Sequence, residues 1–174
     1  DFPFNDPMFD IHWDLKNTGN KSISELAVEG ADINVIPAWK HTTGNRNIIV
    51  SVVDEGIDHT HPDLVDNLWV NEAEKNGQSG VDDDGNGYVD DIYGYNFATN
   101  SGLISWTREG DVGHGAHVAG TIAAVNNNGV GIAGIAGGSG NNDGVRLMSC
   151  QIFNETKGDN GFDGIMTSAS KVAK

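Results

Sequence analysis

The sequence is poor in cysteine, in basic side chains and in long apolar runs. Its one cysteine, Cys150, excludes an internal disulfide, and an apolar neighbourhood indicates a small buried residue. Ten Lys and Arg oppose 25 Asp and Glu, giving a net charge of −15. Nucleic acid and anionic membranes would repel such a chain, so we expect neither as a partner. No apolar run reaches the roughly 18 residues of a membrane span, so none is predicted.

What the chain has is glycine, at 24 of 174 residues, and an ordinary hydrophobic content of 37%. That content argues against disorder. The length suffices for one domain with a real core. The many glycines indicate frequent turns and close approaches of backbone to backbone.

Apolar patterns predict strands that alternate with helices. Residues 47–53 (NIIVSVV) form the clearest buried strand, and residues 92–97 and 145–153 also have strand composition. Residues 114–125 show apolar side chains at helical spacing, and a second helical pattern starts at residue 161. This order indicates an α/β fold, in which a parallel sheet is covered by helices.

The remaining segments are predicted to be irregular. Residues 1–46 form an N-terminal arm that packs on the core, with the apolar patch 35–39 as its docking point. Residues 72–91 form a polar, acidic loop. The core is predicted to occupy residues 47–174, and the last helical pattern runs to Lys174 without a stop signal.

Two segments carry candidate catalytic groups. Asp54 follows the clearest strand, and functional groups collect at the carboxyl ends of strands in open α/β sheets. A plain acidic turn residue is the alternative. His114 begins a helix among small residues (GHGAHVAG), which would leave its imidazole uncovered. His117 follows at i+3, a spacing that also suits a metal, so a general base and a metal ligand both remain open.

The aspartate-rich segment 82–91 (DDDGNGYVDD) predicts a calcium site. Its oxygen-bearing side chains recur at alternate positions, and Gly87 falls where calcium loops turn sharply. Carboxylates this dense repel one another without a cation. A solvated acidic loop is the alternative. The predicted ligands are Asp82, Asp84, Asn86, the carbonyl of Tyr88, and Asp90 or its neighbour Asp91.

Two motifs together resemble those of the subtilase family of serine endopeptidases. Residues 53–64 (VDEGIDHTHPDL) are similar to the family's aspartate motif, and residues 114–121 (HGAHVAGT) to its histidine motif. Glu55 stands where the family has Thr or Ser, and Ala116 where it has Thr. The stretch 5–19 (NDPMFDIHWDLKNTG) resembles the arm that precedes the core in secreted bacterial subtilases.

The resemblance implies the N-terminal portion of a subtilisin-like catalytic domain, a parallel sheet with helices on both faces. It implies peptide hydrolysis by an Asp-His-Ser triad, in which Asp54 orients His114 and His114 takes a proton from the serine. His117 would lie beneath the site as a structural residue. The family's nucleophile motif, Gly-Thr-Ser-Met, is not found in the sequence. We therefore expect the chain to be inactive alone and to have the remaining C-terminal part of the domain as its partner.

The resemblance further implies a polypeptide substrate, structural calcium, and a secreted, cell-surface or periplasmic bacterial protein. A second calcium site of the family would use Asp63 and the loop near Asn127. His12 stands there in place of a glutamine, which argues against full occupancy. Two other functions stay open. One is a metal-dependent hydrolase that uses His114 and His117 with Asp54 or Asp58, and the other is a non-catalytic binding domain.

Overall fold

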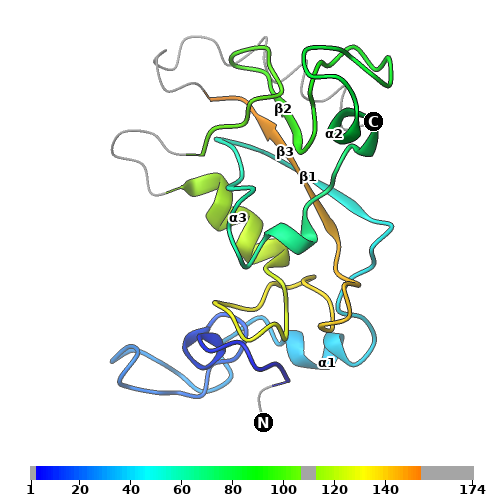
Figure 1. The fold of residues 1–174 in the computed structure, drawn as a ribbon. Helices are drawn as coiled ribbons and strands as arrows, with labels where there is room; N and C mark the ends of the chain where they lie inside the picture. The colour runs from blue at the N-terminus through cyan, green and yellow to red at the C-terminus, as the bar shows by residue number, and fades with distance from the viewer. Residues whose placement is uncertain (1–2, 107–112, 154–174) are drawn as a thin grey trace.

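The computed structural model describes residues 3–106 and 113–153, and its centre is a parallel sheet (Figure 1). The strands are β1 (Ile49–Asp54), β2 (Gly94–Asn96) and β3 (Arg146–Gln151), in the order β1-β3-β2. Asp54 pairs with Gln151, and so does Asn96 from the other side. The three predicted strands and their parallel arrangement are confirmed. The carboxyl ends of all three strands therefore lie at the same end of the sheet, and Asp54 lies there.

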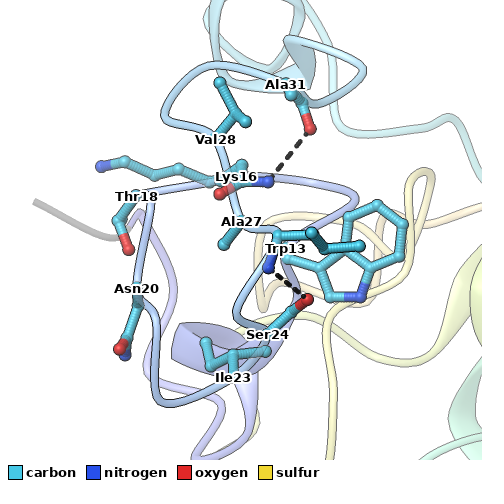
Figure 2. Close-up of a pocket in the computed structure, with 11 residues that line it drawn as sticks. Trp13, Lys16, Thr18, Asn20, Ile23, Ser24, Ala27, Val28 and Ala31 are labelled. Atoms are coloured by element: carbon cyan, nitrogen blue, oxygen red, sulfur yellow. Dashed lines mark hydrogen bonds between the residues drawn. The ribbon is translucent and has the colours of Figure 1, made fainter.

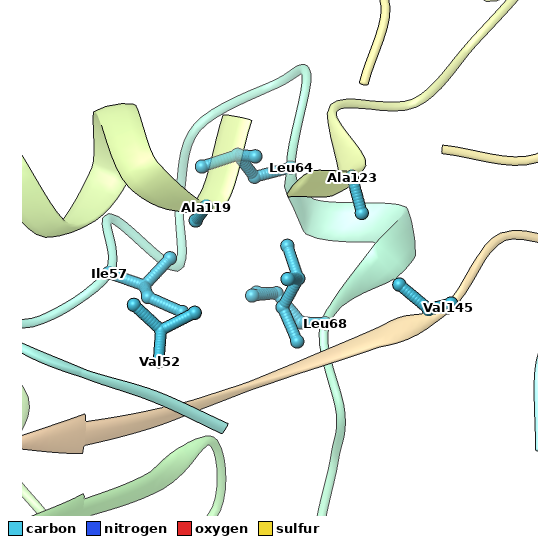
Figure 3. Close-up of a cluster of buried hydrophobic side chains, with 8 residues drawn as sticks. Val52, Ile57, Leu64, Leu68, Ala119, Ala123 and Val145 are labelled. Atoms are coloured by element: carbon cyan, nitrogen blue, oxygen red, sulfur yellow. The ribbon is translucent and has the colours of Figure 1, made fainter. Parts of the chain in front are cut away.

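Helix α3 (His114–Ala123) covers one face of this sheet, as predicted. Figure 3 shows Ala119 and Ala123 on the side of α3 that faces Val52 and Leu68. Both alanines are completely buried. Their small side chains let the helix axis lie close to the strands, which fixes the position of the helix start. The helical pattern predicted from residue 161 lies outside the described residues.

Short helical segments flank this core. They are η1 (Phe9–Ile11), α1 (Val35–Trp39), η2 (Val65–Asn67) and α2 (Glu72–Asn76). The prediction of a loop throughout residues 72–91 is wrong for α2. The side chain of Asn71 caps this helix by accepting the N–H of Ala73 at 3.2 Å, and acidic residues occupy its first turn. No helix in the described part of the chain has the length and apolar character that crossing a bilayer requires.

The N-terminal arm, residues 3–46, lies beside the loop that follows α3 (Figure 1, blue and yellow). It has a small core of its own, in which Phe9, Leu15 and Val35 pack with Ala133 of that loop. The indole Nε1 of Trp39 donates to the carbonyl of Ile135 at 2.8 Å. The apolar patch at 35–39 thus packs the arm against the core.

Asp6 makes a second connection between the arm and this loop. Its side chain is buried, and its two oxygens accept the backbone N–H groups of Asn127 at 2.9 Å and Asn128 at 3.2 Å. We expect Asp6→Asn to lower the free energy of unfolding by about 1–2 kcal/mol, because an NH₂ group would then face an amide donor. Urea unfolding measures the difference. Asp10→Asn, at an exposed position of η1, is the control, and equal midpoints for the two variants would contradict the prediction.

Candidate active site

The structure brings Asp54 and His114 together across 60 positions of sequence. The Nδ1 atom of His114 lies 2.8 Å from Oδ1 and 3.0 Å from Oδ2 of Asp54. An ionised carboxylate only accepts hydrogen bonds, so Nδ1 carries the proton and donates it. The basic lone pair of the neutral ring is therefore on Nε2, the nitrogen directed away from Asp54.

Backbone packing between two glycines sets this geometry. Gly56, in the turn after β1, has φ 115°, and Gly115 is in the first turn of α3. A Cβ atom on Gly115 would collide with the carbonyl oxygen of Gly56. Gly113 precedes the helix with φ 74°, a left-handed conformation that favours glycine. The first turn of α3 can therefore rest directly on the end of β1, and His114 comes to lie over Asp54.

The two side chains differ in exposure. The Asp54 side chain is 15% exposed and that of His114 is 66% exposed. The backbone N–H of Glu55 donates to Oδ1 of Asp54 at 2.7 Å. A backbone amide therefore binds the carboxylate at the position where Glu55 offers no hydroxyl. A shielded carboxylate that orients an accessible imidazole is the arrangement required of a general base.

His117 does not lie beneath the site, and that expectation is wrong. Its side chain is exposed on the helix and borders an open hollow. Small neighbours at Gly113 and Gly120 leave it uncovered. Within the described residues, three metal-binding groups converge only in the acidic region, so His114 and His117 lack the third ligand that a catalytic zinc site needs.

The acidic region contains a compact carboxylate cluster, formed by Glu74, Asp84 and Asp91. One ligand oxygen from each lies within 4.8 Å of the others. Glu74 and Asp91 are 4% and 2% exposed. Burial raises the pKa of Asp91, hydrogen bonds from Asn71 and Asn86 lower it in part, and the charges of Asp84 and Glu74 raise it further. Buried like charges at this distance favour a bound cation.

The structure separates the predicted calcium ligands into two groups. Asp84 belongs to the cluster, and Asn86 lies beside it, its Nδ2 atom 3.2 Å from Asp84 Oδ2 and 3.1 Å from Asp91 Oδ2. Asp82 instead accepts the backbone N–H groups of Asn86 and Gly87.

The Asp90 carboxylate also has a local partner, and of Tyr88, whose carbonyl is the predicted ligand, the structure shows a contact of the ring. The Asp90 carboxylate accepts the N–H of Gly80, and the Tyr88 ring packs against Tyr95 at 4.8 Å. Sequence reasoning missed Glu74, which α2 brings into the cluster from outside the aspartate run. One signal in the sequence could have predicted the position of Glu74. Asn71 is of a residue type that favours helix N-caps, and this cap makes residues 72–76 helical.

Asp63 is hydrogen-bonded to the loop after α3. Its Oδ1 accepts from Nδ2 of Asn128 at 2.8 Å and its Oδ2 from the N–H of Ile132 at 2.9 Å. Burial raises the pKa of Asp63, and these hydrogen bonds lower it in part. His12 lies beside Asp14, with 3.9 Å between Nδ1 and Oδ1. In place of His12, Asp6 and its neighbour Asn5 hydrogen-bond to the loop near Asn127, and the sequence did not single out either side chain.

The arm also contains a hollow of about 260 Å³ (Figure 2). Trp13, Ile23 and Val28 contribute apolar surface to it, and all of its lining residues lie between positions 13 and 31. It is therefore separate from the Asp54–His114 pair, which β1 and α3 provide.

Comparison with known proteins finds subtilisin-like proteases among the most similar sequences. Subtilisin-like protease 1 of Plasmodium vivax is 47% identical over 108 residues, which are 62% of this chain and 16% of that protein. The protein of the same name from Plasmodium falciparum (isolate 3D7) is 37% identical over 156 residues, 90% of this chain and 19% of its own length. The chain thus spans less than a fifth of the length of these relatives.

Solved structures show the same fold. The Aeromonas sobria serine protease, in the crystal structure of its complex with the chaperone ORF2, matches with a TM-score of 0.64 and 27% identity. The match covers 91% of this chain and 22% of that one. A model of the subtilase family matches residues 45–170, which is well over half of the sequence. The chain therefore belongs to the subtilase family.

Proposed function

We propose that this chain provides the aspartate and the histidine of an Asp-His-Ser triad in a serine endopeptidase. The observation that supports this best is the contact of His114 Nδ1 with both oxygens of Asp54, at 2.8 and 3.0 Å. The nucleophile would come from a later segment of the polypeptide, since the family's serine motif does not occur in these 174 residues. The chain alone would then hydrolyse nothing by this mechanism.

In this proposal each group has one task. His114 Nε2 takes the proton from the serine hydroxyl as the serine oxygen attacks the peptide carbonyl, and it later gives that proton to the leaving amine. Asp54 holds the proton on Nδ1 and stabilises the imidazolium that forms in between. The N–H of Glu55, at 2.7 Å, holds the carboxylate in place while the ring changes charge.

A fluorophosphonate probe on the full-length protein tests the proposal, because it labels an activated serine. We expect labelling of the unaltered protein and almost none of His114→Ala, with His41→Ala, at an exposed position of the arm, as the control. Hydrolysis that chelation abolishes and that leaves no label would favour the metal-dependent hydrolase. If the protein is not labelled and hydrolyses nothing, a non-catalytic binding domain is favoured.

We propose calcium as the cation of the Glu74, Asp84 and Asp91 cluster. Calcium takes six to eight oxygen ligands, and the three carboxylates would supply one oxygen each from within 4.8 Å of one another. The burial of Glu74 and Asp91 makes a permanently unneutralised cluster costly. Bound calcium would neutralise it and tie α2 to the aspartate-rich loop, so its part would be structural.

The proposed substrate is a polypeptide, and the proposed partner is the remaining C-terminal part of the catalytic domain. In the described residues β1 pairs with β3 on one side, and Ile49 and Val53 of β1 are 41% and 37% exposed. The other edge of β1 has no strand partner in the described residues and suits a further strand, and Ile49 and Val53 lie on one face of β1 that the remaining part of the domain could cover. A secreted, cell-surface or periplasmic location fits a calcium-stabilised protease, because calcium is abundant outside cells.

A further inference from the structure

We propose that Gln151 is a positioning residue for the Asp54–His114 pair, because it holds Ser105 against the turn that follows β1. This inference rests on the proposed function, since it assigns a further residue to the same catalytic centre. Gln151 is the last residue of β3, and its Cα partner on β1 is Asp54. Its side chain therefore starts beside the strand end that carries the aspartate.

The amide group of Gln151 makes three hydrogen bonds. Its Oε1 accepts the N–H of Ser105 at 2.9 Å, and its Nε2 donates to Oγ of Ser105 at 2.8 Å and to the carbonyl of Phe153 at 3.2 Å. Ser105 is thus bound at both its N–H and its hydroxyl by one side chain 46 positions away. Gln151 is only 2% exposed, so it acts on the site through these neighbours and not by touching a substrate.

Ser105 in turn lies directly against the turn after β1. A Cβ atom on Gly56 would collide with the carbonyl oxygen of Ser105 and would lie 3.2 Å from Oε1 of Gln151. The carbonyl oxygen of Gly56 is also the atom that leaves no room for a Cβ on Gly115. Gly56 is therefore packed between Ser105 and the first turn of α3.

This packing connects both members of the pair. Asp54 precedes Gly56 by two residues, and His114 directly precedes Gly115. A released Ser105 would let the turn move away from α3, which would lengthen the 2.8 Å contact between His114 Nδ1 and Asp54 Oδ1. A displacement of about 1 Å in a catalytic arrangement can cost about 100-fold in rate.

Trp106 holds the same segment at the next position. Its ring meets the ring of His59 edge-on, with the centroids 4.7 Å apart, and His59 stacks on Tyr93, also at 4.7 Å. The Trp106 carbonyl oxygen lies 3.8 Å from the place of a Cβ on Gly113, just before α3. Residues 105–106 therefore contact both the turn after β1 and the start of α3, and Gln151 supplies the directional bonds that fix their backbone.

Gln151→Met in the full-length protein tests this role, because methionine is about as long as glutamine but cannot make these hydrogen bonds. We expect kcat for peptide hydrolysis to fall about 10- to 100-fold, with KM changed less than threefold. The rate of fluorophosphonate labelling should fall by a similar factor, since that reaction needs the activated serine but no bound peptide. Gln151→Asn, whose amide is one methylene further from Ser105, should lose nearly as much.

Asn67→Leu is the matched control. Asn67 is also a buried amide with three hydrogen bonds, to the carbonyls of Ala123 and Gly137 and to Arg46. Ala123 is the last residue of α3, so these bonds lie away from His114. Calorimetry should show a lower melting temperature for both Asn67→Leu and Gln151→Met, whereas slower labelling is expected for the Gln151 variants alone.

The outcomes separate this inference from the proposed function. Equal losses of labelling in Gln151→Met and Asn67→Leu would mean that Gln151 acts on stability alone, and the inference would be wrong. Labelling of Gln151→Met at the rate of the unaltered protein would also overturn it, while the protease proposal would stand. If Gln151→Met does not fold, Gln151→Asn decides. If the unaltered protein shows no His114-dependent labelling, both proposals fall.

Discussion

Asp54→Asn in the full-length enzyme is expected to lower kcat about 10⁴-fold, or about 5.4 kcal/mol in the activation barrier. The amide oxygen of the new side chain would stay on the N–H of Glu55, which now donates to Oδ1 at 2.7 Å. The amide NH₂ would then take the place of Oδ2, 3.0 Å from Nδ1 of His114. It would donate to Nδ1 and force the ring proton onto Nε2, the atom that must act as the base.

Single-turnover and steady-state hydrolysis of a peptide measure this loss. Asp66→Asn, an exposed carboxylate in η2, should keep activity within about threefold. Circular dichroism should give the same spectrum for both variants, because Asp54→Asn preserves the size of the side chain. A loss of less than tenfold at Asp54 would contradict the role assigned to this carboxylate.

Calcium at a hundred times its Kd is expected to raise the melting temperature by about 5–11 °C. Binding at that excess stabilises the folded state by about 2.7 kcal/mol. In a protein of this size each kcal/mol corresponds to about 2–4 °C. Differential scanning calorimetry with calcium and with a chelator measures the shift. Isothermal titration without calcium heat, together with equal melting temperatures, would refute the site.

Asp91→Asn should separate the charge of the cluster from its shape. Because burial raises the pKa of Asp91, the charged form weakens the fold when no cation is bound. That weakening is complete above the raised pKa of the folded state and fades as the pH falls toward the ordinary value for Asp. The variant should therefore respond little to calcium, and in chelator at pH 7 its melting temperature should stay close to that of the parent, because relief of the buried charge is offset by an NH₂ group that faces the amide of Asn71 or Asn86. Glu72→Gln, an exposed charge change in α2, is the control.

The strands and α3 could be predicted because their signals are local, whereas the Asp54–His114 pair was expected from the resemblance of two motifs to those of the subtilase family. The run at 47–53 is continuous and apolar, and the small residues around His114 leave few alternatives to a close helix. Parallel strands end at one edge, which brings the end of β1 to the start of the following helix. The contact between Gly56 and Gly115 then fixes the distance.

The calcium ligands and the surroundings of His117 could not be predicted in the same way, since they depend on long-range packing. Alternation along the loop made Asp82 and Asp84 look equivalent. The loop uses Asp82 to hold its own backbone, whereas Asp84 meets Glu74, which is held in place by α2. His117 lies on a face of α3 that borders a hollow. The residues on the other side of that hollow are distant from His117 in the sequence. Sequence spacing does not report which of these groups become buried together.

Because Asp54 lies on β1, completion of the sheet affects the strength of His114 as a base. In the described part of the chain, β1 has a neighbour on one side, and Asp54 retains 15% of its exposure. A strand added along the open side would exclude water and lower the local dielectric around the carboxylate. The attraction between the carboxylate and a protonated imidazole grows as the dielectric falls. Finishing the sheet and strengthening the base would thus be one assembly step.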